Sequence, residues 1–123
     1  MTSISTFLWF DKQAEQAARF YVSLFPDSRI EQVVRSAADN PSTKEGEVLV
    51  VNFTLAGRSY TAMNGGPGHP FTDAISIAVT TPDQAETDRL WDALLAEGGA
   101  PVACGWLKAV SYTHLTLPTN REV

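Results

Sequence analysis

The sequence predicts an α+β fold built from two consecutive βαβββ modules. An apolar strand-like run, a polar helix-start signal and an amphipathic helix follow one another twice, over residues 4–28 and 74–100. The tripeptide Gln-Ala-Glu at 13–15 recurs at 84–86, and further strand-like runs follow each copy. Self-similarity at one offset is typical of an internal repeat, so the two halves are expected to share one supersecondary unit.

The first copy predicts a strand and then a helix. Ile4 to Phe10 is a short apolar run with aromatic and β-branched residues, which is typical of a buried strand. Asp11 is expected to cap a helix from about Lys12 to Phe25, and Pro26 ends it because the residue before a proline is disfavoured in the α region. The helix carries one apolar face at three- and four-residue spacing, made of Ala14, Ala17, Ala18, Tyr21, Val22 and Phe25.

Three further strands complete the first module. They are expected over 29–36, 47–55 and 58–63, with an exposed polar loop over 37–46 and a tight turn at 56–57. The strand at 47–55 alternates clearly. One of its faces carries Leu49, Val51, Phe53 and Leu55, and the other carries Val48, Val50, Asn52 and Thr54. The pattern leaves open which face packs under the helix and which lines a cleft.

The second half repeats these signals after a glycine- and proline-rich break at 64–70, interpreted as a linker. A strand is expected over 73–80. Thr81 is expected to cap the next helix, with Pro82 at its first position and Gln84 completing a capping box. Its predicted buried stripe is Leu90, Trp91, Leu94 and Leu95, and glycines at 98 and 99 end it before a strand at 100–103.

The composition of the chain argues against several classes of protein. The 123 residues suffice for one domain with a core, and they are 44% hydrophobic and 19% charged. The net charge of −5, without a basic cluster, argues against a nucleic-acid partner. No apolar run approaches the roughly 18 residues of a membrane span, and no signal peptide is visible. Cys104 is the only cysteine, so no intrachain disulfide can form. These features predict a cytoplasmic protein with no membrane partner.

Four stretches of the chain resemble a known family: FLWFDKQAEQAARFYVSLFPDSRI, VVNFTLAGRSYTAMNGGP, FTDAISIAVTTPDQAETDRLWDALLAEGG and CGWLK. They look like the PhnB-like branch of the vicinal oxygen chelate superfamily, which includes glyoxalase I, extradiol dioxygenases and bleomycin- or fosfomycin-resistance proteins. Many members of this branch carry the name 3-demethylubiquinone-9 3-methyltransferase domain. The resemblance implies paired βαβββ modules and a homodimer.

The resemblance also divides the chain. It covers one vicinal oxygen chelate domain over 1–108, with module one at 3–66 and module two at 71–108, and leaves 109–123 as a non-family tail. That tail resembles translated sequencing-adapter sequence, so the second module is expected to be truncated and His114 to have no functional role. Residues from Thr113 to Leu117 nevertheless alternate well enough to pair as a strand.

A metal site is the first chemistry that the resemblance implies. Enzymes of the superfamily hold a divalent ion with His and Glu, and the ion acts as a Lewis acid. Here the matching positions fall near Ser5 and Ala74, which are poor ligands for transition metals. His69 and Asp73 are weak alternative candidates, because two ligands do not complete a site. We therefore expect no metal and no cofactor.

Two other chemistries have little support in the sequence. A methyltransferase that uses S-adenosylmethionine usually has a glycine-rich turn between a parallel strand and a helix, and Gly65-Gly66 leads instead to another strand. Cys104 could act as a nucleophile only beside a base, and the histidines available are His69 and His114. The catalytic residues are therefore unknown.

The remaining hypothesis is a small-molecule site on a concave sheet face, where clefts commonly bind ligands. Its predicted ligand-binding residues are Trp9, Asn52, Tyr60, Asn64 and Trp106. The function favoured is a metal-independent binding protein or divergent enzyme of the superfamily, with an unknown substrate. The alternatives are a metal-dependent lyase or dioxygenase-type enzyme, the ubiquinone-pathway methyltransferase of the family name, and a truncated fragment without activity.

Overall fold

The computed structural model describes residues 2–69, 75–96, 99–102, 106–108 and 114–116. Contacts between Cα atoms divide the chain into two units, Met1–Pro70 and Phe71–Val123. We call them unit 1 and unit 2, and each is described by itself.

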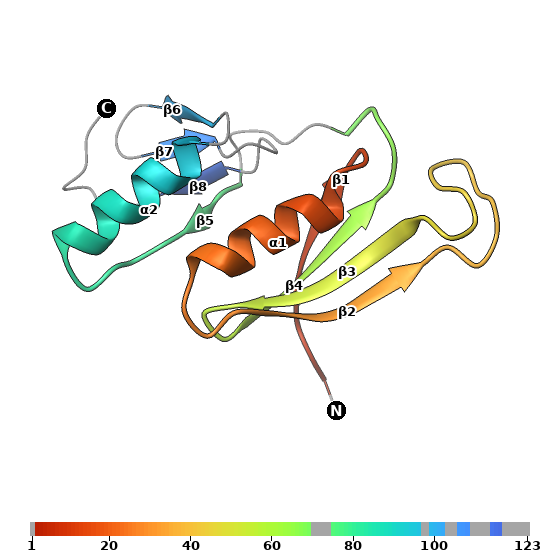
Figure 1. Ribbon diagram of the computed structural model, residues 1–123, viewed down its shortest axis with the longest axis horizontal. Helices are drawn as coiled ribbons and strands as arrows, with labels where there is room; N and C mark the ends of the chain where they lie inside the picture. The colour runs from red at the N-terminus through yellow and green to blue at the C-terminus, as the bar shows by residue number, and fades with distance from the viewer. Residues whose placement is uncertain (1, 70–74, 97–98, 103–105, 109–113, 117–123) are drawn as a thin grey trace. The chain divides into compact units, whose positions relative to one another are not determined.

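Unit 1 is one helix on one mixed four-stranded sheet (Figure 1). Its elements follow the order β1 (Thr6–Phe10), α1 (Ala14–Leu24), β2 (Arg29–Arg35), β3 (Val48–Leu55) and β4 (Arg58–Asn64). The strand order across the sheet is β1-β4-β3-β2. The first strand pairs parallel with β4, and the other pairs are antiparallel. This arrangement is a βαβββ module.

Unit 2 repeats the same topology with shorter strands. Its elements are β5 (Ile77–Ala78), α2 (Gln84–Ala96), β6 (Ala100–Val102), β7 (Trp106–Lys108) and β8 (His114–Thr116). The strand order β5-β8-β7-β6 has the same form as that of unit 1, with the first strand parallel to the last. The α+β fold with βαβββ modules, predicted from the internal repeat, is confirmed.

The expected truncation of the second module is wrong in one respect. The sheet of unit 2 has four strands, because β8 pairs parallel with β5 and antiparallel with β7. The alternation noted over 113–117 therefore does form a strand, at His114–Thr116. Backbone hydrogen bonding is satisfied by any residue other than proline, so even a short alternating segment can complete a sheet.

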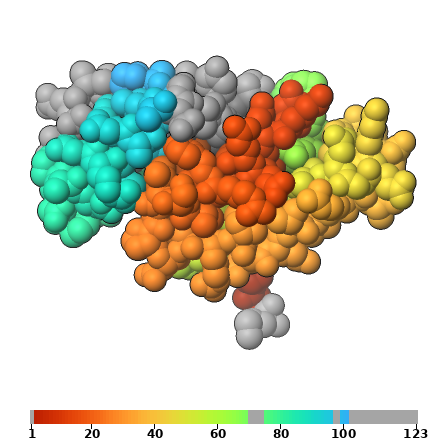
Figure 2. Space-filling view, viewed as in Figure 1, coloured from red at the N-terminus to blue at the C-terminus, as the bar shows by residue number. Residues whose placement is uncertain are grey.

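Small side chains let α1 lie close to the sheet. The helix packs mainly across β3, with β2 and β4 beside it, and in Figure 2 it covers this side of unit 1. The fully buried helix residues are Ala14, Ala17, Ala18 and Tyr21. Below them lie buried sheet residues on the same side: Leu8, Phe10, Val51, Phe53, Leu55, Tyr60 and Ala62. The open question about β3 is thereby answered, because its Val51 and Phe53 face the helix and Asn52 faces away.

Both helix starts differ from the sequence prediction. The N-cap position of α1 is Gln13, not Asp11, and its side chain makes no capping hydrogen bond. Instead, Ala14 N donates to Asn64 Oδ1 over 2.9 Å. In α2 the cap is Asp83, whose Oδ1 accepts from Glu86 N at 2.9 Å, rather than Thr81. Asp is as good a cap as Thr, and its position after Pro82 moves the helix start by two residues.

The tight turn between β3 and β4 follows the prediction. Ala56 and Gly57 have φ values of +48° and +83°. Positive φ at both central residues is the signature of a type I′ turn, whose twist matches that of the flanking strands. The turn thus fixes the register of β3 and β4, in which Asn52 lies opposite Thr61.

The expected loop between β2 and β3 is internally hydrogen-bonded. The Asn40 Oδ1 atom accepts from Thr43 N at 2.8 Å and from Ser42 N at 2.9 Å. The hydroxyls of Ser36 and Thr43 hydrogen-bond each other, and both residues are buried. The loop therefore has a defined shape beside the sheet. Within the described residues, no helix is long and apolar enough to cross a membrane.

We predict that Ala18→Leu destabilises the protein by about 1–3 kcal/mol, because Ala18 is fully buried between α1 and the sheet and extra methyl groups overpack this contact. Urea denaturation measures the free energy of unfolding. The matched control is Ser23→Leu on the exposed side of the same helix, which is expected to change stability by less than about 0.5 kcal/mol. Equal effects of the two substitutions would contradict the packing described.

Candidate functional site

The sheet of unit 1 has one face that α1 does not cover, which we call the open face. Strand pairing places its side chains in two rows that span all four strands and in a third, Ser59, Thr54 and Arg29, across three of them. Because alternate residues of a strand point to opposite faces, the rows follow from the register. The polar row is Phe7, Thr61, Asn52 and Gln32, and the apolar row is Trp9, Met63, Val50 and Val34.

Side-chain hydrogen bonds connect the polar row. Thr61 Oγ1 donates to Asn52 Oδ1 over 3.0 Å, and the hydroxyls of Thr61 and Ser5 are 3.3 Å apart. Asn52 Nδ2 donates to Gln32 Oε1 at 3.4 Å, which is long for such a bond. Asn52 is half-buried and Gln32 is exposed. The row thus presents amide and hydroxyl groups to its surroundings while holding them in place.

Aromatic side chains flank these amides, and they differ in availability. Phe7, at the β1 end of the polar row, is 56% exposed. Trp9 is half-buried, and its Nε1 donates to Gly66 O over 2.9 Å. The imidazole of His69 lies against the indole, with ring centroids 4.6 Å apart. Phe7 therefore has the freer ring on this face.

The Trp9 indole also requires a glycine beside it. A Cβ atom built on Gly65 would lie 2.2 Å from Cζ2 of the indole, far inside van der Waals contact. The Gly65 backbone is itself held, because its N donates to Phe10 O at 2.9 Å. The predicted linker thus folds back over Trp9, which fastens the end of β4 to β1.

Two of the predicted site residues lie on the opposite, helix-covered face. Tyr60 is 7% exposed and stacks on Phe53 with ring centroids 5.4 Å apart. Burial raises the pKa of the Tyr60 phenol, and the positive charge of Arg58 partly opposes the shift. Tyr60 and Asn64 therefore cannot share one sheet surface with Trp9 and Asn52.

Asn64 joins three elements of unit 1. Its Oδ1 accepts from Ala14 N at the start of α1, and its Nδ2 donates over 3.0 Å to Val48 O at the start of β3. Asn64 itself ends β4 and is 7% exposed. One amide side chain thus satisfies an otherwise unpaired helix-end donor and a strand carbonyl.

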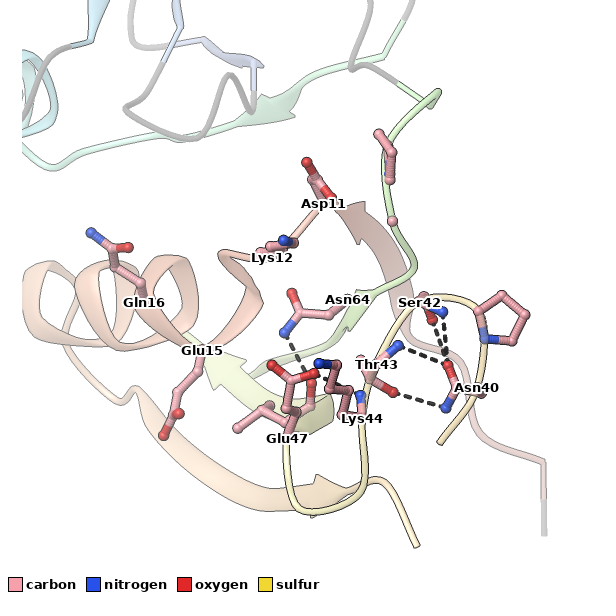
Figure 3. A pocket seen from close by; sticks show the side chains of 14 residues that line it. Asp11, Lys12, Glu15, Gln16, Asn40, Ser42, Thr43, Lys44, Glu47 and Asn64 are labelled. Atoms are coloured by element: carbon pink, nitrogen blue, oxygen red, sulfur yellow. Dashed lines mark hydrogen bonds between the residues drawn. The ribbon is translucent and has the colours of Figure 1, made fainter. Parts of the chain in front are cut away.

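A hollow of about 830 Å³ lies over Asn64 (Figure 3). The start of α1 and the loop before β3 form its walls, as the close-up shows. Its charged lining residues are Asp11, Lys12, Glu15, Lys44 and Glu47. Asp11 Oδ1 is buried and has no hydrogen-bond partner among the described residues. The lining mixes both signs of charge, and Asn64 uses both ends of its amide within the fold. The chemistry of the hollow thus differs from that of the open face, whose two rows across all four strands carry no charged residue.

Several predicted site residues lie outside what the structure describes. Trp106 is in β7 and His114 is in β8, but only their backbones are described. Asp73, Ala74 and Cys104 are outside the described residues. The proposed pairing of His69 with Asp73, and the nucleophilic role of Cys104, therefore stay predictions.

The described residues do not gather a set of strong metal ligands. No group of three or more His, Cys, Asp or Glu side chains is found among them in positions to hold an ion. Around Ser5, where the resemblance placed a ligand, the neighbours are the neutral oxygens of Thr61 and Asn52. Such donors, without a carboxylate or imidazole, do not fit a transition metal.

Three residues of the open face were not predicted from the sequence, namely Phe7, Thr61 and Gln32. Phe7 could have been found from strand alternation, because it is two residues from Trp9 and shares its face. Thr61 and Gln32 needed the register, which depends on the turn at 56–57 and on an irregularity in β2 between Ile30 and Gln32.

Comparisons with known proteins agree with this architecture. A family model described as 3-demethylubiquinone-9 3-methyltransferase matches residues 2–111. A Bacillus cereus structure described as a 3-demethylubiquinone-9 3-methyltransferase, PhnB protein, is 34% identical, with a TM-score of 0.79, over 95% of this chain and 100% of that one. No curated protein matches.

More distant structures share the fold alone. A Pseudomonas aeruginosa protein is 19% identical, with a TM-score of 0.73, over 95% of this chain and 96% of that one. A fosfomycin resistance protein from Listeria monocytogenes is 17% identical, with a TM-score of 0.56, over 97% of this chain and 91% of that one. Nothing in these matches supports an adapter origin for residues 109–123.

We predict that Gly65→Ala destabilises unit 1 by about 1–3 kcal/mol, because the new methyl group and the Trp9 indole cannot occupy the same space. Urea denaturation of single and double variants tests the cause. In a Trp9→Phe background the benzo ring of the indole, which causes the clash, is absent. Gly65→Ala is therefore expected to lower the free energy of unfolding by less in this background. Additive losses in the double variant would contradict the contact.

We predict that Asn64→Ala lowers the free energy of unfolding by about 1–3 kcal/mol, because the buried Ala14 N–H loses its acceptor. Hydrogen exchange at the Ala14 amide should become faster in the variant. Asn52→Ala is the matched control, because in the described part of the chain the Asn52 amide hydrogen-bonds only to other side chains, so its loss should lower the free energy of unfolding less. A larger loss for Asn52→Ala would show that the open face, not the Asn64 junction, stabilises the fold.

Proposed function

Because the chain belongs to the PhnB-like 3-demethylubiquinone-9 3-methyltransferase family, which has the glyoxalase-like fold, we propose that it binds a small organic molecule without a metal ion. The binding surface is the open face of unit 1. The protein acts there as a binding protein or as a divergent enzyme of the vicinal oxygen chelate superfamily.

One observation carries this proposal. The open face places an exposed aromatic ring, Phe7, in the same row as the hydrogen-bonded amides of Asn52 and Gln32. Small-molecule sites in proteins combine apolar and aromatic surface with a few positioned polar groups. The two sequence-predicted residues on this face, Trp9 and Asn52, fit the same role, with Trp9 supporting the site through its loop contacts and Asn52 contacting the ligand.

Metal chemistry is less favoured because of the donors on this face. Ser5, Thr61, Asn52 and Gln32 offer neutral oxygens, which bind Zn²⁺, Fe²⁺ or Mn²⁺ weakly compared with imidazole and carboxylate. No step of the proposed function depends on a bound ion. The metal-dependent lyase or dioxygenase would need ligands from outside this face.

Methyl transfer, which the family description names, has no specific support in the described residues. The connection from β1 to α1 is Asp11–Gln13, and the one from β5 to α2 also lacks glycine. A dinucleotide- or nucleoside-type cofactor is usually held by a glycine-rich turn of this kind. The homodimer and the cytoplasmic location that the sequence analysis expected stay predictions.

We predict that the purified, dialysed protein holds far less than one metal ion per chain and that small organic fragments shift the amide NMR signals of residues 7, 52 and 61. Asn52→Ala should weaken the binding of these fragments about tenfold, which corresponds to about 1.4 kcal/mol. Gln16→Ala, an exposed α1 residue, is the control and should leave binding unchanged.

Two outcomes would contradict this function. One is stoichiometric metal whose removal by a chelator abolishes fragment binding. The other is a set of fragments that shift only the amide NMR signals of residues around the hollow beside α1 and leave the signals of the open face unchanged.

A further inference from the structure

We propose that the ligand of the open face is an uncharged compound with a flat apolar ring and one hydrogen-bonding edge. The ring stacks on Phe7, and the edge meets Asn52 and Gln32. This inference rests on the proposed function and adds to it the chemical class of the ligand.

The open face carries few charges. Neither of the two rows that span all four strands contains Asp, Glu, Lys or Arg. The next row of the same face is Ser59, Thr54 and Arg29, and its one charged residue, Arg29, pairs with Glu31 over 2.9 Å. Glu31 also accepts from Thr54 at 2.7 Å. Because Arg29 and Glu31 already pair with each other, a charged ligand beside the polar row would lose hydration without gaining an unpaired opposite charge, which disfavours it.

The two amides of the polar row have unused hydrogen-bonding capacity. Asn52 uses one of its two amide hydrogens, in the long 3.4 Å bond to Gln32. The Gln32 amide nitrogen donates to no group in the described part of the chain, and its side chain is exposed. Because both groups are primary amides, they match a ligand that offers a carbonyl beside an N–H or hydroxyl. Such an edge can bond both amides while staying uncharged.

The two aromatic rings of this face differ in how much of their surface a ligand can cover. The Trp9 indole is occupied by the His69 ring, by the Gly65 backbone and by its bond to Gly66. Phe7 is 56% exposed, so a flat ring can cover it and gain from burying apolar area. The stacking residue of this face is therefore Phe7, not the tryptophan that the sequence suggested.

The spacing of the two contacts sets the size of the ligand. Phe7 and Asn52 lie in one row with β4 between their strands. Neighbouring strands are about 4.8 Å apart, so the backbones at these residues are separated by about 10 Å. A bicyclic ring system with a lactam edge spans this distance when side chains reach from both ends. A single small ring would reach only one contact.

Three probes that share one ring system test the ligand class. They are 2-quinolone, which is uncharged, a carboxylate derivative of 2-quinolone and an aminomethyl derivative, which carries a positive charge. Dissociation constants are measured by NMR titration of the full chain, so that the shifted amides also locate the site. We expect 2-quinolone to bind at least about tenfold more tightly than either charged probe, with shifts at residues 7, 52 and 61.

Variants then separate the two contacts. Phe7→Ala should weaken the binding of 2-quinolone about fivefold to tenfold, whereas Phe20→Ala on α1 should leave the affinity for 2-quinolone unchanged. Asn52→Lys places a positive charge in the polar row, so it should reverse the preference toward the carboxylate probe. Both variants lie on half-buried or exposed positions, and circular dichroism checks that they fold.

Each remaining outcome overturns the inference. Tightest binding by a charged probe at these residues would exclude an uncharged ligand but leave the proposed function standing. Unchanged affinity in Phe7→Ala would exclude the stacking role. If no probe binds, the ligand class is wrong, and the proposed function fails with it only if the wider fragment screen also finds no site on the open face.

Discussion

The close packing of α1 on the sheet decides most of what unit 1 can do. Three alanines, Ala14, Ala17 and Ala18, leave room for the helix to lie over β3, with Tyr21 filling the space beside them. Because α1 covers one face of the sheet, alternate residues of the strands point into the core. The alternate residues form the other face, and their chemistry is then free to serve binding.

This division gives similar side chains different roles. Asn52 and Asn64 are both strand amides, yet Asn64 lies under the helix, where it bonds Ala14 N and Val48 O. Asn52 lies on the open face and bonds only to side chains. Trp9 and Phe7 share the open face but also differ in role. The glycine-rich segment after β4 contacts the Trp9 indole and leaves the Phe7 ring exposed. Stability and binding thus depend on different members of each pair.

The two units share one topology but differ in how much sheet they form. Strands of five to eight residues make the sheet of unit 1, whereas those of unit 2 have two or three residues. Longer strands present more cross-strand pairs, and these pairs hold side chains in fixed rows. Unit 1 is therefore the better candidate for a binding surface. The family match over 2–111 spans both units.

The sequence by itself determined the repeated βαβββ order, the approximate positions of both helices and the family. It could do so because hydrophobic periodicity, proline and glycine act locally and leave a pattern in adjacent residues. It also determined that Asn52 and Phe53 face opposite ways, but not which of them is buried.

Tertiary structure decided the rest. The helix cap that comes from Asn64, fifty residues after Ala14, leaves no local signal. The strand that completes unit 2 depends on its pairing with β5 and β7. The row from Phe7 to Gln32 requires the register of four strands that are distant in sequence. Which side chains meet on the open face is therefore fixed only when the strands pair and α1 covers the other side, since residues far apart in the chain become neighbours through packing alone.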